Sequence, residues 1–362
     1  MKALFKSLII LLLLPAVAVA GNNDKFKGKY TKEKKLSKEY TVNANAGLRI
    51  DNTYGNLDIV TWGQNRTVIE VTITTNGNNE EKVQKRLDDI DVEFSGNASL
   101  VSAKTKIGSG GRSWSWWNNK NNGVSIEVNY VVKVPVTNSL DLSNDYGAIN
   151  LNESNGNVKI SCDYGQLNIG RLNADNNLLS FDYTNNSSIA YMKSGRINAD
   201  YSSFSLDEVE YLELNADYTK SSIEKVGELN YNCDYGKLNV GDVGTVTGNG
   251  DYIPASFDRV SGNFNINSDY GSITVDRLMP AAGDVTIKSS YAGIRLGYDP
   301  GYNFDFMVNL SYASLSGKDD LNLRMESKDG SQKSYQGYHG SANSGNTINV
   351  RSSYGGVTLK KQ

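Results

Sequence analysis

The chain has 362 residues, of which 37 are Lys or Arg and 40 are Asp or Glu, so its formal net charge is −3. This balance excludes the strongly basic surface of a typical nucleic-acid-binding domain. With 22 Tyr, 35 Gly and only 5 Pro, the composition is typical of strands and turns rather than of helices or disorder.

Residues 1–20 have the pattern of a cleavable secretory signal. Lys2 and Lys6 precede an apolar run over residues 8–14, and Ala18-Val19-Ala20 forms a small-residue cleavage site. The apolar run is too short to span a bilayer, and no Cys stands at the cleavage point to receive a lipid. We therefore predict cleavage after Ala20, export to the periplasm or outer surface of a bacterium, and no transmembrane segment.

Two regions precede the regular part of the chain. Residues 21–40 are rich in Lys and lack an apolar period, which predicts a polar linker, with electrostatic contact to an acidic envelope surface as the alternative. Residues 41–139 predict one coil over 42–62, followed by a β-rich cap with strands at 68–75, 92–105 and 124–136 and a helix at 79–90. Such a cap would cover the strand edges at a solenoid end.

Tyrosines then recur at a nearly fixed distance. From Tyr146 to Tyr312 the steps are 17 to 21 residues, and the last step of 42 is twice 21. A period this short and regular indicates a solenoid. Tyr54 occupies the same place in the coil over 42–62. The regular ladder consists of Tyr146, Tyr164, Tyr183, Tyr201, Tyr218, Tyr235, Tyr252, Tyr270, Tyr291, Tyr312 and Tyr354.

The residues around each ladder tyrosine form uniform columns. With Tyr as position 0, positions −6 and −4 are apolar and position −2 is mostly small, which predicts a strand. Apolar residues resume at +3 and +5, and Gly often stands at +1, which predicts a bend there. The tyrosines stand an even number of residues after the apolar columns at −6 and −4, so in a strand they would point to the same side. We therefore expect the rings to pack at the corner of the core. The alternative is an exposed strip that stacks on a glycan.

The predicted fold class is all-β: a single-stranded parallel β-solenoid, or β-helix, with 17–21-residue coils and a small N-terminal β-rich cap containing one short helix. Regular coils are expected over 140–316, a loop or hairpin excursion around Asp329-Gly330 over 317–347, and a final coil over 348–362. Parallel crossovers strongly prefer the right hand, although left-handed solenoids with similar coils exist.

The two cysteines, Cys162 and Cys233, both stand at position −2 and are four coils apart. Strands in a sheet are spaced about 4.8 Å apart, so the separation is roughly 19 Å, whereas a disulfide needs Cα atoms within roughly 7 Å. We therefore predict two buried free thiols.

Several segments together resemble a known family. They are Asn79–Phe94 (NEEKVQKRLDDIDVEF), the V-x-V-P run Val132–Pro135 and the serial D-Y-G-x-φ-x-φ coils. In these features, roughly residues 40–360 resemble the bacterial envelope proteins grouped as putative adhesins of unknown function. The resemblance implies an exported, non-enzymatic β-solenoid, and it brings no catalytic motif.

Position −1 carries a column of carboxylates. The structural interpretation is that each Asp caps the bend by accepting hydrogen bonds from backbone amides, and that Ser or Asn residues at −3 stack beside it. The functional interpretation is that the column binds cations such as calcium, or a polar glycan, although no calcium loop accompanies it. The column consists of Asp145, Asp163, Asp182, Asp200, Asp217, Asp234, Asp251 and Asp269.

A Trp-rich segment breaks the repeat. Trp114, Trp116 and Trp117 lie together in a polar-flanked loop. A loop with three indoles either packs onto the fold or contacts a ligand, which could be a glycan, a membrane surface or a protein partner. These residues are the candidate ligand-binding site.

Catalysis is the less favoured class of function. The acids are periodic, so no acid dyad stands out, and the only His, His339, has no metal-binding partner in a segment predicted to be a loop. We expect a non-enzymatic cell-envelope protein, an adhesin-like or scaffold solenoid that binds a glycan or protein partner. The alternatives are a polysaccharide-degrading β-helix enzyme and a calcium-stabilised, purely structural solenoid. No other cofactor is expected, and the oligomeric state stays open.

Overall fold

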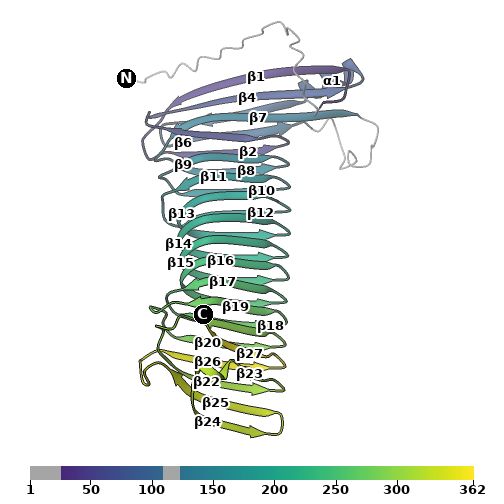
Figure 1. The fold of residues 1–362 in the computed structure, drawn as a ribbon. Helices are drawn as coiled ribbons and strands as arrows, with labels where there is room; N and C mark the ends of the chain where they lie inside the picture. The colour runs from purple at the N-terminus through teal and green to yellow at the C-terminus, as the bar shows by residue number, and fades with distance from the viewer. Residues whose placement is uncertain (1–25, 109–122) are drawn as a thin grey trace. The chain divides into compact units, whose positions relative to one another are not determined.

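The chain divides into two compact units, residues 1–169 and 170–362, and the computed structural model describes residues 26–108 and 123–362 (Figure 1). The all-β prediction is confirmed, because strands dominate both units and one α-helix occurs among the described residues. The predicted signal and Trp114, Trp116 and Trp117 lie outside that part. Within it, no helix is long and apolar enough to cross a membrane.

In its described ranges, 26–108 and 123–169, the first unit has one helix and eleven strands, the last of which contains the boundary between the units. The elements are β1 (Tyr30–Thr41), β2 (Gly47–Thr53), β3 (Leu57–Trp62), β4 (Arg66–Gly77), α1 (Glu80–Asp88), β5 (Ile90–Gly96), β6 (Leu100–Ile107), β7 (Val124–Pro135), β8 (Ser139–Asp145), β9 (Ala148–Ser154), β10 (Val158–Asp163) and β11 (Gln166–Leu172).

The prediction of a polar linker over residues 21–40 is wrong for its second half. Strand β1 pairs antiparallel with β4 along its full length, from Tyr30 opposite Gly77 to Thr41 opposite Arg66. Its side chains alternate between half-buried and exposed rather than buried and exposed. The apolar period that marks a core strand is therefore absent, and lysines fill positions that discourage another chain from adding to this edge.

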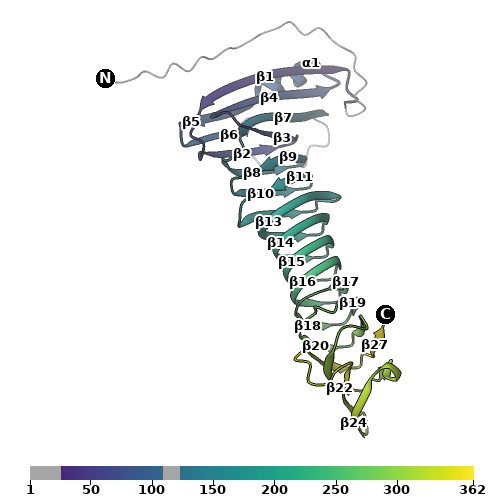
Figure 2. The same cartoon turned by 60° about the vertical axis from the view of Figure 1, so that its left-hand side comes forward.

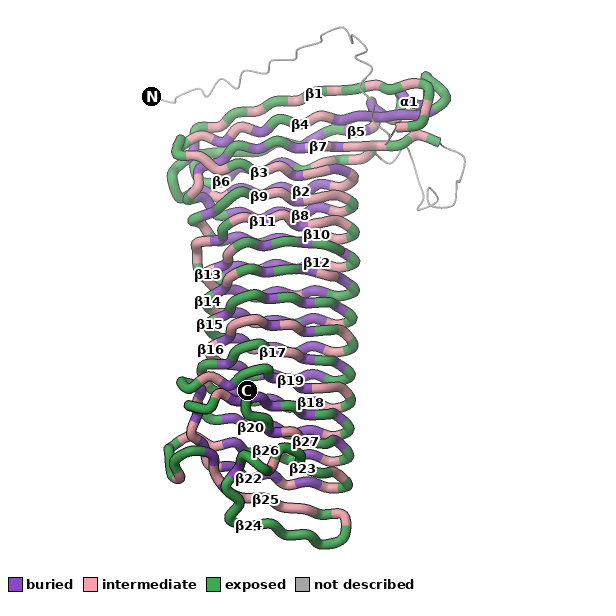
Figure 3. Tube along the Cα trace, viewed as in Figure 1, coloured by how far each residue is buried: buried purple, intermediate pink, exposed green. Residues whose placement is uncertain are grey.

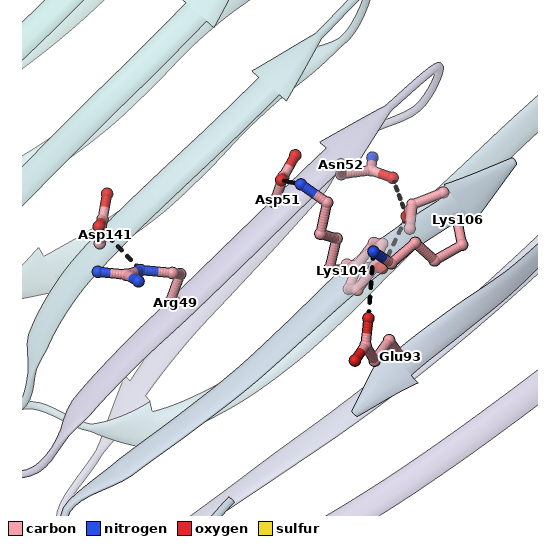
Figure 4. Close-up of polar contacts among 9 residues, drawn as sticks. Arg49, Asp51, Asn52, Glu93, Lys104, Lys106 and Asp141 are labelled. Atoms are coloured by element: carbon pink, nitrogen blue, oxygen red, sulfur yellow. Dashed lines mark hydrogen bonds and ion pairs between the residues drawn. The ribbon is translucent and has the colours of Figure 1, made fainter. Parts of the chain in front are cut away.

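The cap is joined to the first coil by continuous strand pairing. Strand β2 lies between β6 and β8, and β3 lies between β7 and β9, all in parallel register. Figure 4 shows ion pairs that join neighbouring strands across this region, including Arg49 to Asp141, 3.1 Å, and Lys104 to Asp51. The cap thus covers the strand edges of the first coil, as the sequence analysis expects.

The predicted helix is confirmed as α1. Asn79 caps its first turn by accepting a hydrogen bond from the Lys82 N–H, 3.0 Å. Val83 and Leu87 are buried on one face, at the i, i+4 spacing of an amphipathic helix.

The second unit is a stack of parallel strands followed by a hairpin (Figures 1 and 2). Its elements are β12 (Asn177–Asp182), β13 (Ser187–Asp200), β14 (Ser203–Asp217), β15 (Lys220–Asp234), β16 (Lys237–Asp251), β17 (Pro254–Val260), β18 (Phe264–Asp269), β19 (Ser272–Leu278), β20 (Val285–Ser290), β21 (Gly293–Tyr298), β22 (Phe304–Ser311), β23 (Leu315–Ser316), the 3-10 helix η2 (Lys318–Asp320), β24 (Asn322–Asp329), β25 (Gln332–His339), β26 (Thr347–Ser353) and β27 (Val357–Lys361).

The core of the second unit consists of apolar columns in register. Leu212 pairs with Leu229, Leu229 with Val246, and Val246 with Phe264, and all four side chains are buried. Figure 3 shows the same alternation of buried and exposed residues along the successive strands. Because each coil stacks its apolar residues on those of the next, the strands can be short and still bury a continuous interior.

The final coil, residues 348–362, does not stack after the coil of Tyr312. Strand β26 pairs in parallel with both β20 and β22, so the end of the chain lies between two earlier coils. The spacing of 42 residues is equally compatible with either position, because the inward columns of all three strands are apolar. Stacking order depends on the path of the intervening excursion, which the periodicity does not encode.

That excursion forms the predicted hairpin and closes the stack. Strands β24 and β25 pair antiparallel around Asp329-Gly330, and β25 pairs antiparallel with β22. His339 ends β25 rather than lying in a loop. Its ring is buried against Tyr298 and Phe304, and its Nδ1 lies 2.8 Å from the carbonyl oxygen of Tyr302. The contacts of His339 are thus those of a residue in the packed core.

Both cysteines are buried free thiols, as the coil register predicts. Burial raises the pKa of the Cys233 thiol to about 12, which keeps it protonated and unreactive at neutral pH.

We expect a thiol reagent at pH 8 to leave Cys162 and Cys233 unlabelled in the folded protein, because both thiols are buried. In denaturant both should react without prior reduction. Mass spectrometry of the labelled protein measures the number of modified thiols, and a disulfide that must be reduced first would contradict the observed register.

Candidate functional site

The tyrosine ladder is exposed, so the prediction that it packs at the corner of the core is wrong. Eleven ladder rings are 42–63% exposed, from Tyr146 at 42% to Tyr312 at 63%. The apolar columns at −6 and −4 point inward as predicted. The alternation of inward and outward side chains therefore holds along the strand but ends at the tyrosine, whose ring points outward.

The cause is the backbone conformation of the tyrosines. All twelve, Tyr54 included, have φ between 51° and 67°, in the left-handed region that side chains with a Cβ rarely adopt. This conformation turns the chain at position 0 and directs the ring outward. The predicted bend therefore falls on Tyr rather than on the following residue. Gly236 has another role, since a Cβ there would lie 2.1 Å from the Thr219 carbonyl oxygen of the adjacent coil.

The strand ladder continues through this turn. The Tyr201 N–H donates to the Asp217 carbonyl oxygen at 3.0 Å, and the Tyr218 N–H donates in the same way to Asp234 at 2.9 Å. The tyrosine N–H therefore keeps its hydrogen bond in the strand ladder where the chain changes direction.

The exposed rings stack on one another in each unit. In the second unit neighbouring ring centroids lie 4.7–5.0 Å apart with interplanar angles of 2–6°. We call these rings the tyrosine row. In stacking order they are Tyr183, Tyr201, Tyr218, Tyr235, Tyr252, Tyr270, Tyr291, Tyr354 and Tyr312.

Stacking decides what the tyrosine row can present. Between the two ends of the row each ring is stacked on both faces, so a sugar cannot stack on it as the predicted strip requires. Ring edges and phenol hydroxyls remain on the outside. A left-handed residue costs about 1–2 kcal/mol, and an aromatic pair returns about 0.5–1.5 kcal/mol, so stacking approximately offsets the backbone strain.

The aspartate column runs beside the tyrosine row and makes regular hydrogen bonds. The Asp217 N–H donates to Asp200 Oδ1 at 3.1 Å, and the Asp234 N–H donates to Asp217 Oδ1 at 3.1 Å. The column ends where the Ser290 N–H donates to Asp269 Oδ1 at 2.7 Å. From Asp182 to Asp269 each carboxylate thus accepts a hydrogen bond from the backbone of the next coil, rather than capping its own bend as predicted.

Burial and mutual repulsion act on these carboxyl groups. Partial burial, together with the neighbouring carboxylates of Asp234 and Asp200, raises the pKa of Asp217 despite the hydrogen bond that it accepts. Burial and the Asp163 carboxylate likewise raise the pKa of Asp145. At these two positions the ionised carboxylate therefore carries a small electrostatic cost at neutral pH.

The described ranges, 26–108 and 123–362, contain no cluster of three or more His, Cys, Asp or Glu side chains that could hold a metal ion. The column has one Asp per coil, so the carboxylates lie in a line along the stack and do not surround a common point. The carboxylates are therefore not arranged as a calcium cage.

Two shallow hollows lie on the outer surface of the second unit. One, of about 420 Å³, lies over Gly241 and is lined by charged side chains including Glu224, Asp258 and Arg259. The other, of about 460 Å³, is lined by Thr247, Gly248, Asn249, Asn265, Ile266, Asn267, Thr286 and Lys288, and we call it the amide hollow. Neither hollow was predicted from the sequence. The run of Asn at position −3, followed by Lys288, was the only signal for the second hollow.

Comparisons with known proteins give distant structural likenesses. No family model matches the chain, and no curated protein matches it. A putative adhesin of Parabacteroides merdae is similar in structure at 9% identity, covering 90% of this chain and 96% of that one, with a TM-score of 0.32. A putative adhesin of Parabacteroides distasonis is similar at 10% identity, covering 90% of this chain and 97% of that one, with a TM-score of 0.29.

A putative cell adhesion protein of Clostridium sporogenes is similar at 11% identity, covering 91% of this chain and all of that one, with a TM-score of 0.18. These names agree with the family that the sequence resembles. Identities and TM-scores this low transfer no function to the chain.

We expect Asp217→Asn to stabilise the fold at pH 7 and low salt, by less than about 1 kcal/mol after solvent screening. The raised pKa means that the folded state disfavours the ionised carboxyl, so this group adds stability only at low pH and loses it as pH rises through the folded pKa. The gain of the variant should therefore vanish below pH about 4. Thermal melts from pH 3 to pH 8 measure it.

Asp242→Asn is the matched control of opposite sign. Its hydrogen bond with Arg259 lowers the pKa of Asp242, so its ionised form stabilises the fold above the unfolded pKa, and this stability is lost as pH falls. This variant should be less stable than the wild type at pH 7 and approach it in acid. The same sign for both variants would contradict the electrostatic account of the column.

Proposed function

We propose that the protein is an exported, non-enzymatic, adhesin-like solenoid of right-handed parallel coils, which binds an extended polymer along the tyrosine row of the second unit. The observation that carries the proposal is the row itself, with nine aromatic side chains in line and each close to half exposed. Soluble proteins rarely leave so much contiguous aromatic surface uncovered unless it contacts a partner.

The spacing of the row favours a polymer over a compact ligand. Successive rings repeat at 4.7–5.0 Å, so they present the same hydroxyl at each coil, with a carboxylate beside each ring from Tyr183 to Tyr270. A chain of sugars repeats at a similar distance and can make one weak contact per coil. Many weak contacts along one chain add to a useful affinity without any deep pocket.

The chemistry of the row favours a glycan over a protein. Ring faces are covered by stacking, which leaves phenol hydroxyls and Asp carboxylates as the accessible groups. Together they donate and accept hydrogen bonds, as sugar hydroxyls require. An apolar protein segment would instead need exposed ring faces or an open apolar groove. The Trp114, Trp116 and Trp117 segment remains a second candidate for ligand contact.

Replacing Tyr218, Tyr235 and Tyr252 together by Asn should abolish binding to extended glycans on an array while preserving the fold. Asn tolerates the left-handed conformation, so the turn is kept although three rings are lost. Circular dichroism and thermal melts establish folding. The variant Tyr218→Phe/Tyr235→Phe/Tyr252→Phe keeps the stack and removes only hydroxyls, so it should bind more weakly than the wild type but better than the Asn variant.

The matched control is Ser222→Ala/Asn239→Ala/Ser256→Ala, at position +4 of the same three coils. These side chains pair in register on β15, β16 and β17 and lie on a different side of each coil. Binding should be unchanged in this variant. Equal loss in both variants, or none in the Asn variant, would exclude the tyrosine row. Release of reducing ends from a bound oligosaccharide would favour the alternative of a polysaccharide-degrading enzyme.

A calcium-stabilised structural solenoid is the other alternative, and thermal melts test it. Because the column carboxylates bind backbone amides and are not grouped around a point, we expect calcium to change the melting temperature no more than magnesium at the same ionic strength. A calcium-specific rise that a chelator reverses would support a cation in the Asp column.

A further inference from the structure

The amide hollow, together with a pair of cations beside it, has features of a second binding site. Its outward side chains at position −3 are Asn249 on β16, Asn267 on β18 and Lys288 on β20, which pair in register. The next strand in the stack is β26, which places Arg351 directly opposite Lys288. We call Lys288 and Arg351 the basic pair.

The basic pair exists only because of the stacking order. Lys288 and Arg351 are far apart in the sequence, and they become neighbours because the final coil lies between those of Tyr291 and Tyr312. Like charges directly opposite one another in a sheet are unfavourable. Both side chains are exposed, and neither has an ion pair or hydrogen bond within the described ranges.

Nothing in position −1 neutralises the pair. The aspartate column ends at Asp269, and the strands that carry Lys288 and Arg351 have Ser290 and Ser353 there instead. The Asp269 carboxylate accepts the Ser290 N–H, and Asp284 is engaged with Thr347. The switch from Asp to Ser therefore coincides with the appearance of two cations, and the local charge changes sign.

The amides of the hollow are available to a ligand. Earlier in the same column the amides bond one another, with Asn215 Nδ2 donating to Asn198 Oδ1 at 3.0 Å. Asn249, Asn265 and Asn267 make no such side-chain hydrogen bond within the described part of the chain. A row of free amides can both donate to and accept from neutral hydroxyl groups.

We propose that this surface binds an oligosaccharide in which one carboxylated sugar is joined to neutral sugars. The carboxylate would lie over Lys288 and Arg351, and the neutral sugars would lie across Thr247, Asn249, Asn265 and Asn267. A continuous polyanion fits less well, because Asp251 and Asp269 flank the amide end of the hollow. The inference rests on the proposed function and deepens it by naming a ligand class.

The test uses the whole mature chain and two matched trisaccharides. One is a glucuronic acid joined to xylobiose, and the other is its carboxyl-reduced form, which keeps every other hydroxyl. Ligand-observed NMR titration measures both affinities. We expect the acid to bind at least about tenfold more tightly, because a charge-assisted hydrogen bond contributes that much, and the preference to weaken with added salt.

The variant Lys288→Gln/Arg351→Gln should abolish the preference for the acid. Its control is Lys220→Gln/Lys237→Gln, which removes another pair of exposed lysines that lie opposite each other on β15 and β16. The control should keep the preference, since it changes net charge equally. Asn249→Ala/Asn267→Ala should weaken binding of both trisaccharides.

The outcomes separate this site from the tyrosine row. No preference for the acid, no binding of either trisaccharide, or a preference that survives Lys288→Gln/Arg351→Gln overturns the site. If the Asn variant of Tyr218, Tyr235 and Tyr252 binds extended glycans normally while the basic pair still selects the acid, the proposed function of the row fails and the site stands.

Discussion

The left-handed tyrosine at the end of one strand in each coil is the constraint on which the rest of the structure depends. It turns the chain without interrupting the strand ladder, because its N–H still donates to the next coil, as Tyr201 does to Asp217. The strain recurs in every coil and is offset only if the rings lie in register. Stacking therefore couples each turn to its neighbours, and tyrosines that are 17, 18 or 21 residues apart in the sequence stack in one row.

The sequence predicted the interior well and the surface poorly, for a physical reason. Inward columns such as Leu212, Leu229 and Val246 follow a period of two that burial enforces, so their register could be read directly. A residue with positive φ breaks the alternation of inward and outward side chains. Tyrosine rarely adopts this conformation, so the break was not expected there. The ladder was therefore located correctly and assigned to the wrong side of the chain.

The cap and the end of the chain show a second limit. Strand β1 has no buried face, so its Lys-rich sequence resembled a linker, although pairing with β4 orders it. The final coil was recognised from its repeat pattern. Similarity between repeats, however, does not show which strands are adjacent in the stack. Pairing of β26 between β20 and β22 depends on the hairpin β24–β25 occupying the end of the stack.

This stacking order has a chemical consequence for the surface. Where the coils follow the sequence, each strand lies beside the strands of the preceding and the following repeat. Insertion of the final coil allows Arg351, from the end of the chain, to stand beside Lys288 where the Asp column has given way to Ser. The polar −3 column and the acidic −1 column thereby acquire a place where the charge changes sign within two strands, from Asp269 to Lys288 and Arg351. Recognition of a particular sugar needs such a place, because a uniform row can bind a polymer but cannot select one of its units.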